Sequence, residues 1–120
     1  MIIALKRAYE PPSPDDGLRL LVERLWPRGV SKEAARIDHW FKDIAPSPEL
    51  RKWYDHQPDR WPGFQSRYRS ELEAAGSDAI GQLVAMCRDA DVTFVFAARD
   101  EARNSAVVLR DFVIARMGRS

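Results

Sequence analysis

The stretch Val92-Thr93-Phe94-Val95-Phe96-Ala97 decides the fold class of this chain. It is rich in β-branched and aromatic residues and contains no charge, so it predicts a strand. A strand that is apolar at every position is buried on both faces, which is typical of the centre of a parallel sheet. The sequence therefore predicts an α/β fold with this segment as a central strand.

Two further strands are expected earlier in the chain, at residues 2–7 and 18–25. The loop between them, residues 11–17, contains three prolines, which fix φ and remove backbone donors. The connection from the second strand to residues 92–97 has a helical pattern, and this favours parallel pairing through a right-handed crossover. We therefore expect one domain over residues 1–120, with a short, mainly parallel sheet of about three strands in a three-layer arrangement, flanked by helices on both faces.

The helices are predicted from apolar residues that recur three and four positions apart. Ser31 can cap a helix that carries Ile37, Trp40 and Phe41 on one face, and Pro46 ends that pattern. Ser47 and Pro48 then begin a second helix, which ends near His56. The remaining helices are expected over residues 58–75, across Ile80 to Cys87, and over residues 101–117, the last of them capped by Asp100.

Composition excludes several classes of protein. The chain has 120 residues and a formal charge of +1, which is not the charge of a strongly basic nucleic-acid-binding module. It has one cysteine, no zinc-ligand spacing and no phosphate-cradling or dinucleotide-binding glycine motif, so we expect no metal and no cofactor. No apolar run approaches the length of about 18 residues that spans a bilayer, and we expect a cytoplasmic protein without a membrane partner.

Charged residues follow the predicted strands where each strand ends. The second strand leads into Arg24 and Arg28, and the third leads into Arg99 and Asp100. The carboxyl ends of parallel strands meet at one edge of a sheet, where α/β proteins bind ligands. Arginine recognises phosphate and carboxylate groups with paired donors. The pattern therefore predicts a crevice for an anionic small molecule.

Each expected site residue has a role in this hypothesis. Arg24, Arg28 and Arg99 would hold the anion and Asn104 would orient it. Asp100 would position the arginines or accept a proton, and His56 is the second candidate for proton transfer. Lys42 and Arg51 are outer ligand-binding candidates.

Three other interpretations stay open. Together with Glu23, the same charged residues could form an ion-pair network that serves only the fold. They could contact a nucleic-acid backbone, although the charge makes this partner unlikely, or the domain could be a protein-interaction module. Neither the oligomeric state nor the presence of enzymatic activity follows from the pattern.

The motifs resemble those of the YeaO-like family of small, uncharacterised bacterial proteins. The resemblance is carried by Asp16 to Arg19 with Glu23 to Lys32, by Trp40 to Ser47 with Leu50 to Trp53, and by Ala97 to Glu101 with Asn104, Ala106 and Leu109. It implies that the first strand is also parallel, because in longer relatives a helix joins the first two strands. It also marks two departures: Ser105 stands where relatives often have histidine, and Glu23 where they usually have aspartate. If that histidine carries a proton in the family, this chain would be impaired or would use His56.

Overall fold

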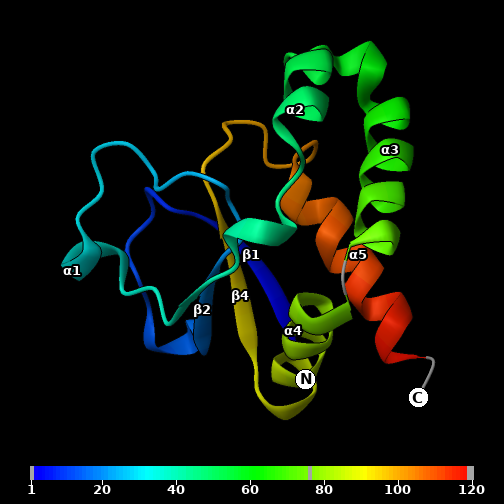
Figure 1. The fold of residues 1–120 in the computed structure, drawn as a ribbon. Coiled ribbons are helices and arrows are strands. Elements are labelled where there is room, and N and C mark those ends of the chain that lie inside the picture. Colours follow the sequence, from blue (N-terminus) through cyan, green and yellow to red (C-terminus); the bar gives the residue numbers. More distant parts are fainter. Residues whose placement is uncertain (1, 76, 119–120) are drawn as a thin grey trace.

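The computed structural model describes residues 2–75 and 77–118, and the sheet at its centre is entirely parallel. Four strands lie in the order β1-β4-β2-β3 (Figure 1). They are β1 (Ile3–Arg7), β2 (Leu18–Leu21), β3 (His39–Trp40) and β4 (Val92–Phe96). The predicted α/β class and parallel pairing are confirmed, and the sheet has one strand more than expected.

β4 is the central strand, as its sequence predicted. All five of its residues are buried. It pairs with β1 along its whole length, from Ile3 opposite Val92 to Arg7 opposite Phe96, and with β2 on its other side. The parallel direction of β1, which the family resemblance implied, is confirmed. β1 and β2 are joined by the proline-rich loop, which contains only the short 3-10 helix η1 (Pro14–Asp16).

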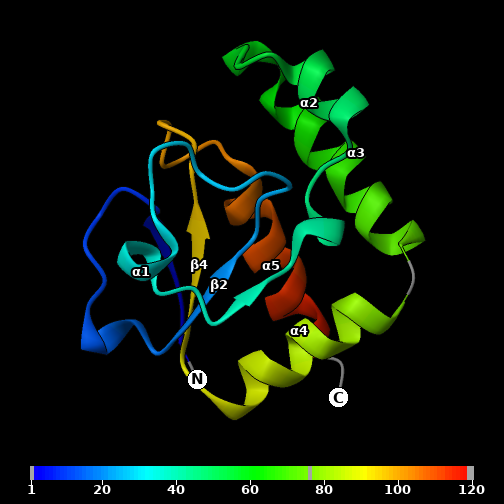
Figure 2. The ribbon, with the colours of Figure 1, turned by 60° about the vertical axis from the view of Figure 1, so that its left-hand side comes forward.

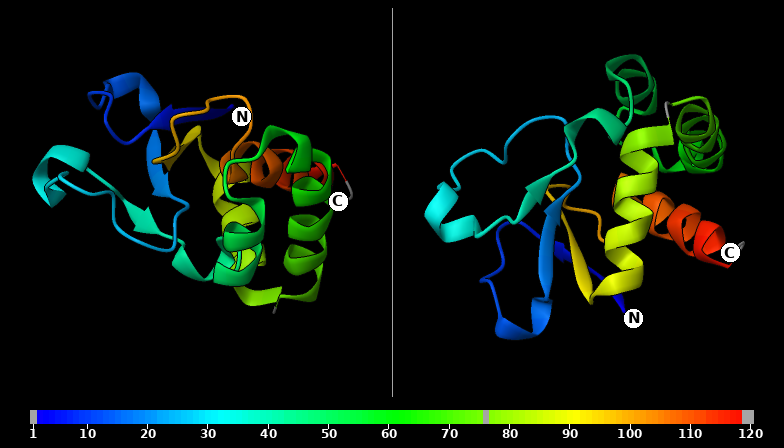
Figure 3. Two further views of the ribbon diagram at one scale, coloured as in Figure 1. Left: turned by 90° about the horizontal axis from the view of Figure 1, so that it is seen from above. Right: turned by 60° about the horizontal axis from the view of Figure 1, so that its bottom comes forward.

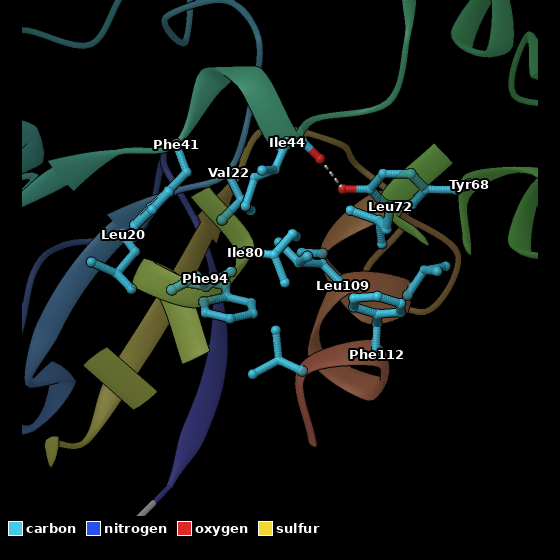
Figure 4. Packing of buried hydrophobic residues seen from close by; sticks show 14 of the residues in the cluster. Leu20, Val22, Phe41, Ile44, Tyr68, Leu72, Ile80, Phe94, Leu109 and Phe112 are labelled. Atoms are coloured by element: carbon cyan, nitrogen blue, oxygen red, sulfur yellow. Dashed lines mark hydrogen bonds between the residues drawn. The ribbon is translucent and has the colours of Figure 1, made fainter. Parts of the chain in front are cut away.

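Helices flank both faces of the sheet, but unequally. Four of them cover one face, and α1 (Lys32–Ala35) lies on the opposite side, as Figures 2 and 3 show. On the larger side, Leu20, Val22 and Phe94 pack with helix residues such as Leu109 in one apolar core (Figure 4). The four helices are α2 (Pro48–Tyr54), α3 (Trp61–Ala74), α4 (Ser77–Asp89) and α5 (Ser105–Met117).

The second face of the sheet combines a small apolar cluster with buried charges. Leu21, Val95 and Ala8 pack with Trp26, Ile37 and Trp40. Beside them the Asp16 carboxylate pairs with Lys6 at 3.2 Å and with Arg19 at 2.7 Å. Burial by itself would raise the pKa of Asp16, but hydrogen bonds from Ser13, Lys6 and Arg19 outweigh it and lower that pKa. This carboxylate therefore ties the proline-rich loop to β1 and β2.

The predicted helix carrying Ile37, Trp40 and Phe41 is wrong. Helix α1 has only four residues and ends at Arg36, which has a left-handed backbone with φ 49°. The chain then extends along the edge of β2, where Asp38 N–H donates to Arg19 and Phe41 N–H donates to Leu21. Trp40 and Phe41 pack in different clusters on the two faces of the sheet. The apolar spacing that suggests a helix therefore belongs to extended chain after α1, in which Trp40 and Phe41 point to opposite faces of the sheet and Ile37 packs in the same cluster as Trp40.

Two predicted boundaries also need correction. β2 ends at Leu21 rather than Leu25, and Leu25 is 70% exposed. α5 begins at Ser105 rather than at residue 101, because Asn104 is its N-cap and accepts a hydrogen bond from Val107 N–H. Asp100 instead accepts hydrogen bonds from Ala102 N–H and Arg103 N–H within the preceding loop. Both corrections lengthen the loops at the carboxyl edge of the sheet.

Two glycine substitutions of opposite sign test this fold. Gly17 has φ +63° and ψ −139°, and an added Cβ would collide with the backbone of Asp91. We expect Gly17→Ala to lower the free energy of unfolding by about 3 kcal/mol, because the chain must shift as well as accept a strained conformation. Gly81 lies inside α4 with open space around it, so Gly81→Ala is the matched control and should raise that free energy by about 1 kcal/mol. Urea unfolding of both variants measures the two changes. An unchanged free energy of unfolding in Gly17→Ala would contradict the close approach of Gly17 to the Asp91 backbone.

Candidate functional site

A crevice lies at the carboxyl ends of β2 and β4, lined by residues of α2 and of the beginning of α5. Figure 2 shows how these elements are arranged. The crevice consists of two adjoining hollows of about 530 and 540 Å³. Five residues line both hollows: Tyr54, His56, Ala97, Ala98 and Arg103. The first hollow is also lined by charged and polar residues, which are Glu23, Arg51, Lys52, Asp55, Asn104 and Ser105. The second adds Arg99, Asp100 and Pro58.

Glu23 connects the ends of the two strands that form the floor of the crevice. Its carboxylate Oε1 accepts a hydrogen bond from Ala97 N–H at 2.9 Å, and its carbonyl accepts one from Trp40 Nε1 at 2.6 Å. Burial raises the pKa of Glu23, while the Ala97 N–H and the charge of Arg51 partly oppose that rise. Oε2 accepts no hydrogen bond from any described residue, so this oxygen is available to a ligand.

The end of α2 brings a free cation and a strained turn to the crevice. Arg51 is exposed, and its guanidinium forms no ion pair or hydrogen bond with residues 2–75 and 77–118. Asp55 and His56, which follow α2, both have left-handed backbones with φ 46° and 54°. This conformation costs roughly 1–2 kcal/mol for a residue other than glycine. It reverses the chain so that His56 lies on the rim, and such strain is common at functional sites.

The loop between β4 and α5 contributes the opposite wall. Asp100 forms an exposed ion pair with Arg103 at 3.6 Å. Hydrogen bonds from the backbone of Arg103 and Ala102 lower the pKa of Asp100. The amide of Asn104 is engaged at both ends, because it accepts from Val107 N–H and donates to the Asp100 carbonyl. Asn104 thus positions the start of α5 within the crevice wall.

The structure brings together five of the eight predicted site residues. Arg51, His56, Arg99, Asp100 and Asn104 all line the crevice. Their roles in binding or proton transfer stay predictions. The convergence follows from the parallel sheet, because β4 and its loop end beside the chain that leaves β2.

Arg24, Arg28 and Lys42 do not line this crevice. The Arg24 guanidinium donates to the carbonyls of Ala45 and Pro46 at 3.2 and 3.5 Å. Arg28 is exposed in the loop after β2, where its carbonyl accepts a hydrogen bond from Tyr9. The Lys42 ammonium lies 5.2 Å from the centre of the Trp40 ring. Because β2 ends at Leu21, the chain has left the sheet before it reaches the two arginines.

The expected ion-pair network among Glu23 and the strand-end arginines is absent from the described part of the chain. Only Asp100 forms an ion pair at this edge, and its partner is Arg103. Sequence reasoning missed both Arg103 and Tyr54. Arg103 could have been found from Asn104, which is a strong N-cap residue and places Arg103 immediately before the helix. No local signal distinguishes Tyr54 from the other aromatic residues of the core.

The described residues offer no group of three or more histidine, cysteine or acidic side chains that could hold a metal ion. None of their helices combines the length and apolar character needed to cross a membrane. Cys87 is buried in the core, and burial raises the pKa of its thiol to about 11.

The pH dependence of stability tests the environment of Glu23. Because the pKa of Glu23 is raised in the folded protein, the unfolded chain loses the Glu23 proton at a lower pH than the folded protein does. Glu23 therefore lowers stability progressively as the pH rises from the ordinary carboxyl range through the raised pKa. Glu23→Gln keeps an acceptor for Ala97 N–H but cannot ionise. Relative to this variant, wild type should be most stable near pH 4 and should lose free energy of unfolding as the pH rises towards 7. Urea unfolding at intervals of one pH unit measures the difference in free energy of unfolding between wild type and Glu23→Gln. If wild type gained stability relative to the variant as the pH rose, the burial of Glu23 would be contradicted.

Comparison with known proteins places the chain in a family. The model of the family described as the "Inactive DUF488-N3 subclade" matches residues 2–120. The uncharacterized protein Rv3073c of Mycobacterium tuberculosis is 45% identical over 114 residues, which cover 95% of each chain. The uncharacterized protein YeaO of Escherichia coli is 35% identical over 113 residues, or 94% of this chain and 97% of YeaO. No solved structure matches. The resemblance to YeaO is confirmed, and the chain belongs to the family described as the inactive DUF488-N3 subclade.

Proposed function

We propose that the crevice binds a small molecule bearing a phosphate or carboxylate group and does not turn it over. The observation that carries this proposal is the Arg51 guanidinium, which has no partner among the described residues and lines a hollow of about 530 Å³. A guanidinium in such a position is a strong donor pair for an oxyanion.

The surroundings of Arg51 add positive charge and backbone donors. The charged lining residues are Arg51, Lys52, Arg99 and Arg103 against Glu23, Asp55 and Asp100, so the crevice carries a small positive excess. At the beginning of α5, the N–H groups of Ser105 and Ala106 donate to no described acceptor. Free N–H groups at the start of a helix favour an anion. Arg51, Arg103 and Ser105, the first residue of α5, line the same hollow.

The residues do not form an evident catalytic set. Asp100 is engaged by two backbone donors and by Arg103, so it is a poor proton acceptor. Ser105 lies in the crevice wall at the position where relatives often have histidine. The family description also contains the word inactive. These points support binding without turnover, and they leave His56 as the remaining candidate for proton transfer.

Arginine substitution tests the proposal. Inorganic phosphate should raise the melting temperature of wild type, because a ligand that binds only the folded state stabilises it. Arg51→Ala should weaken phosphate binding about tenfold, since one charge-assisted hydrogen bond contributes roughly 1.5–3 kcal/mol. Arg28→Ala removes the same charge outside the crevice and should keep the wild-type response. Thermal shift at constant ionic strength, followed by calorimetric titration, measures both variants.

Two results would contradict the proposal: no phosphate effect on wild type, or equal losses in Arg51→Ala and Arg28→Ala. A strongly salt-dependent affinity for oligonucleotides would then favour the alternative nucleic-acid-binding function. Absence of both effects would favour a protein-interaction module.

A further inference from the structure

We infer that the ligand of the crevice carries its anionic group on a planar aromatic ring, and that Tyr54 selects the ring. This inference rests on the proposed anion binding and goes further by naming the chemical class. Aromatic phosphates and carboxylates belong to this class, and so do nucleotides. Tyr54 carries the argument because it lines both hollows and therefore stands where they join.

Tyr54 is held rigidly by other aromatic rings. Its ring centroid lies 4.7 Å from that of Phe64 and 6.0 Å from that of Trp61. Phe64 and Trp61 are themselves stacked, with centroids 5.6 Å apart and planes inclined by 16°. The Tyr54 ring is only partly buried, so the aromatic cluster extends from the core into the wall of the crevice. A fixed ring that reaches a cavity can stack on a ligand ring with little loss of side-chain entropy.

The rest of the apolar lining is small or rigid. Pro46 and Pro48 line the first hollow, and Ala97 and Ala98 line both hollows. None of these side chains adds a charge or a hydrogen-bonding group. Ligand sites generally combine such apolar walls with a few well-placed polar groups. The polar groups of this lining include Arg51, Arg103 and Glu23.

Charges of both signs act on the Tyr54 side chain. Burial, followed by the charge of Asp100, raises the pKa of Tyr54, and Arg103 partly opposes that rise. The hydroxyl forms no hydrogen bond with the described residues. An anionic group bound by Arg103 could therefore also accept a hydrogen bond from the neutral Tyr54 hydroxyl.

A matched pair of ligands tests the ring. Phenyl phosphate and cyclohexyl phosphate have the same charge and similar size, but only the first is planar and aromatic. Wild type should bind phenyl phosphate about fivefold more tightly, as expected from an aromatic pair worth about 1 kcal/mol. Tyr54→Leu should remove this preference and keep binding of inorganic phosphate, whereas Tyr54→Phe should keep the preference. Tyr9→Leu is the control, because Tyr9 is an exposed tyrosine outside the crevice.

Calorimetric titration gives the affinity of wild type and of each variant for every phosphate, and the melting temperature of each variant without ligand shows that it is folded. Adenosine 5′-monophosphate and ribose 5-phosphate, which lacks the base, form a second pair. Their comparison tests whether the ring is a nucleobase. A Tyr54-dependent preference for the aromatic member of either pair supports the inference. The pair with the larger preference shows whether a simple aromatic ring or a nucleobase fits better. Equal affinities within both pairs, with phosphate still bound, would overturn the inference alone. Failure of every compound, phosphate included, would overturn the proposed function as well.

Discussion

The structure depends on the burial of β4 between two parallel neighbours. Every residue of this strand is inaccessible to water, and its backbone is hydrogen-bonded to β1 on one side and β2 on the other. Such a strand must be covered on both faces, so the protein places its helical core on one face and a smaller apolar and ionic cluster on the other. This requirement accounts for the neighbouring strands β1 and β2 and for the α-helices that the described residues place on the two sides of the sheet.

The same constraint produces the crevice. A central strand that runs parallel to its neighbours delivers its following loop to the edge where theirs also emerge. Glu23 and Ala97 are thereby brought within hydrogen-bonding distance, although they are far apart in the chain. The small residues Ala97 and Ala98 leave space there, and α2 and α5 supply the walls. The crevice is therefore a consequence of the fold rather than a feature added to it.

The balance of charge around the crevice distinguishes it from the opposite face of the sheet. On that face Lys6 and Arg19 share one buried carboxylate, Asp16, which holds the proline-rich loop in place. At the crevice, Arg51 and Arg99 have no such partner among the described residues. Cations that are buried with an acid serve the fold, whereas exposed cations without one are free to meet an anion. This contrast is the physical basis for our proposal that an anion binds at the carboxyl edge.

The sequence predicted the fold class, the central strand and the parallel pairing of β2 with β4, because a fully apolar strand and a helical connection leave local patterns. The direction of β1 was implied only by the family resemblance. The sequence also predicted that Arg99, Asp100 and Asn104 would meet at one edge, since β4 leads directly to them. It could not place Trp40 and Phe41 correctly. Together with Ile37 they have the spacing of one helix face, but in the structure they lie in extended chain at the edge of the sheet. Only the tertiary structure decided which arginines reach the crevice. Arg24 turns to the carbonyls of Ala45 and Pro46, whereas Arg51 from α2 and Arg103 from the loop before α5 line the same hollow. Contacts between distant segments depend on the residue at which each strand ends. That residue is set by the packing of the whole chain rather than by the sequence on either side of it.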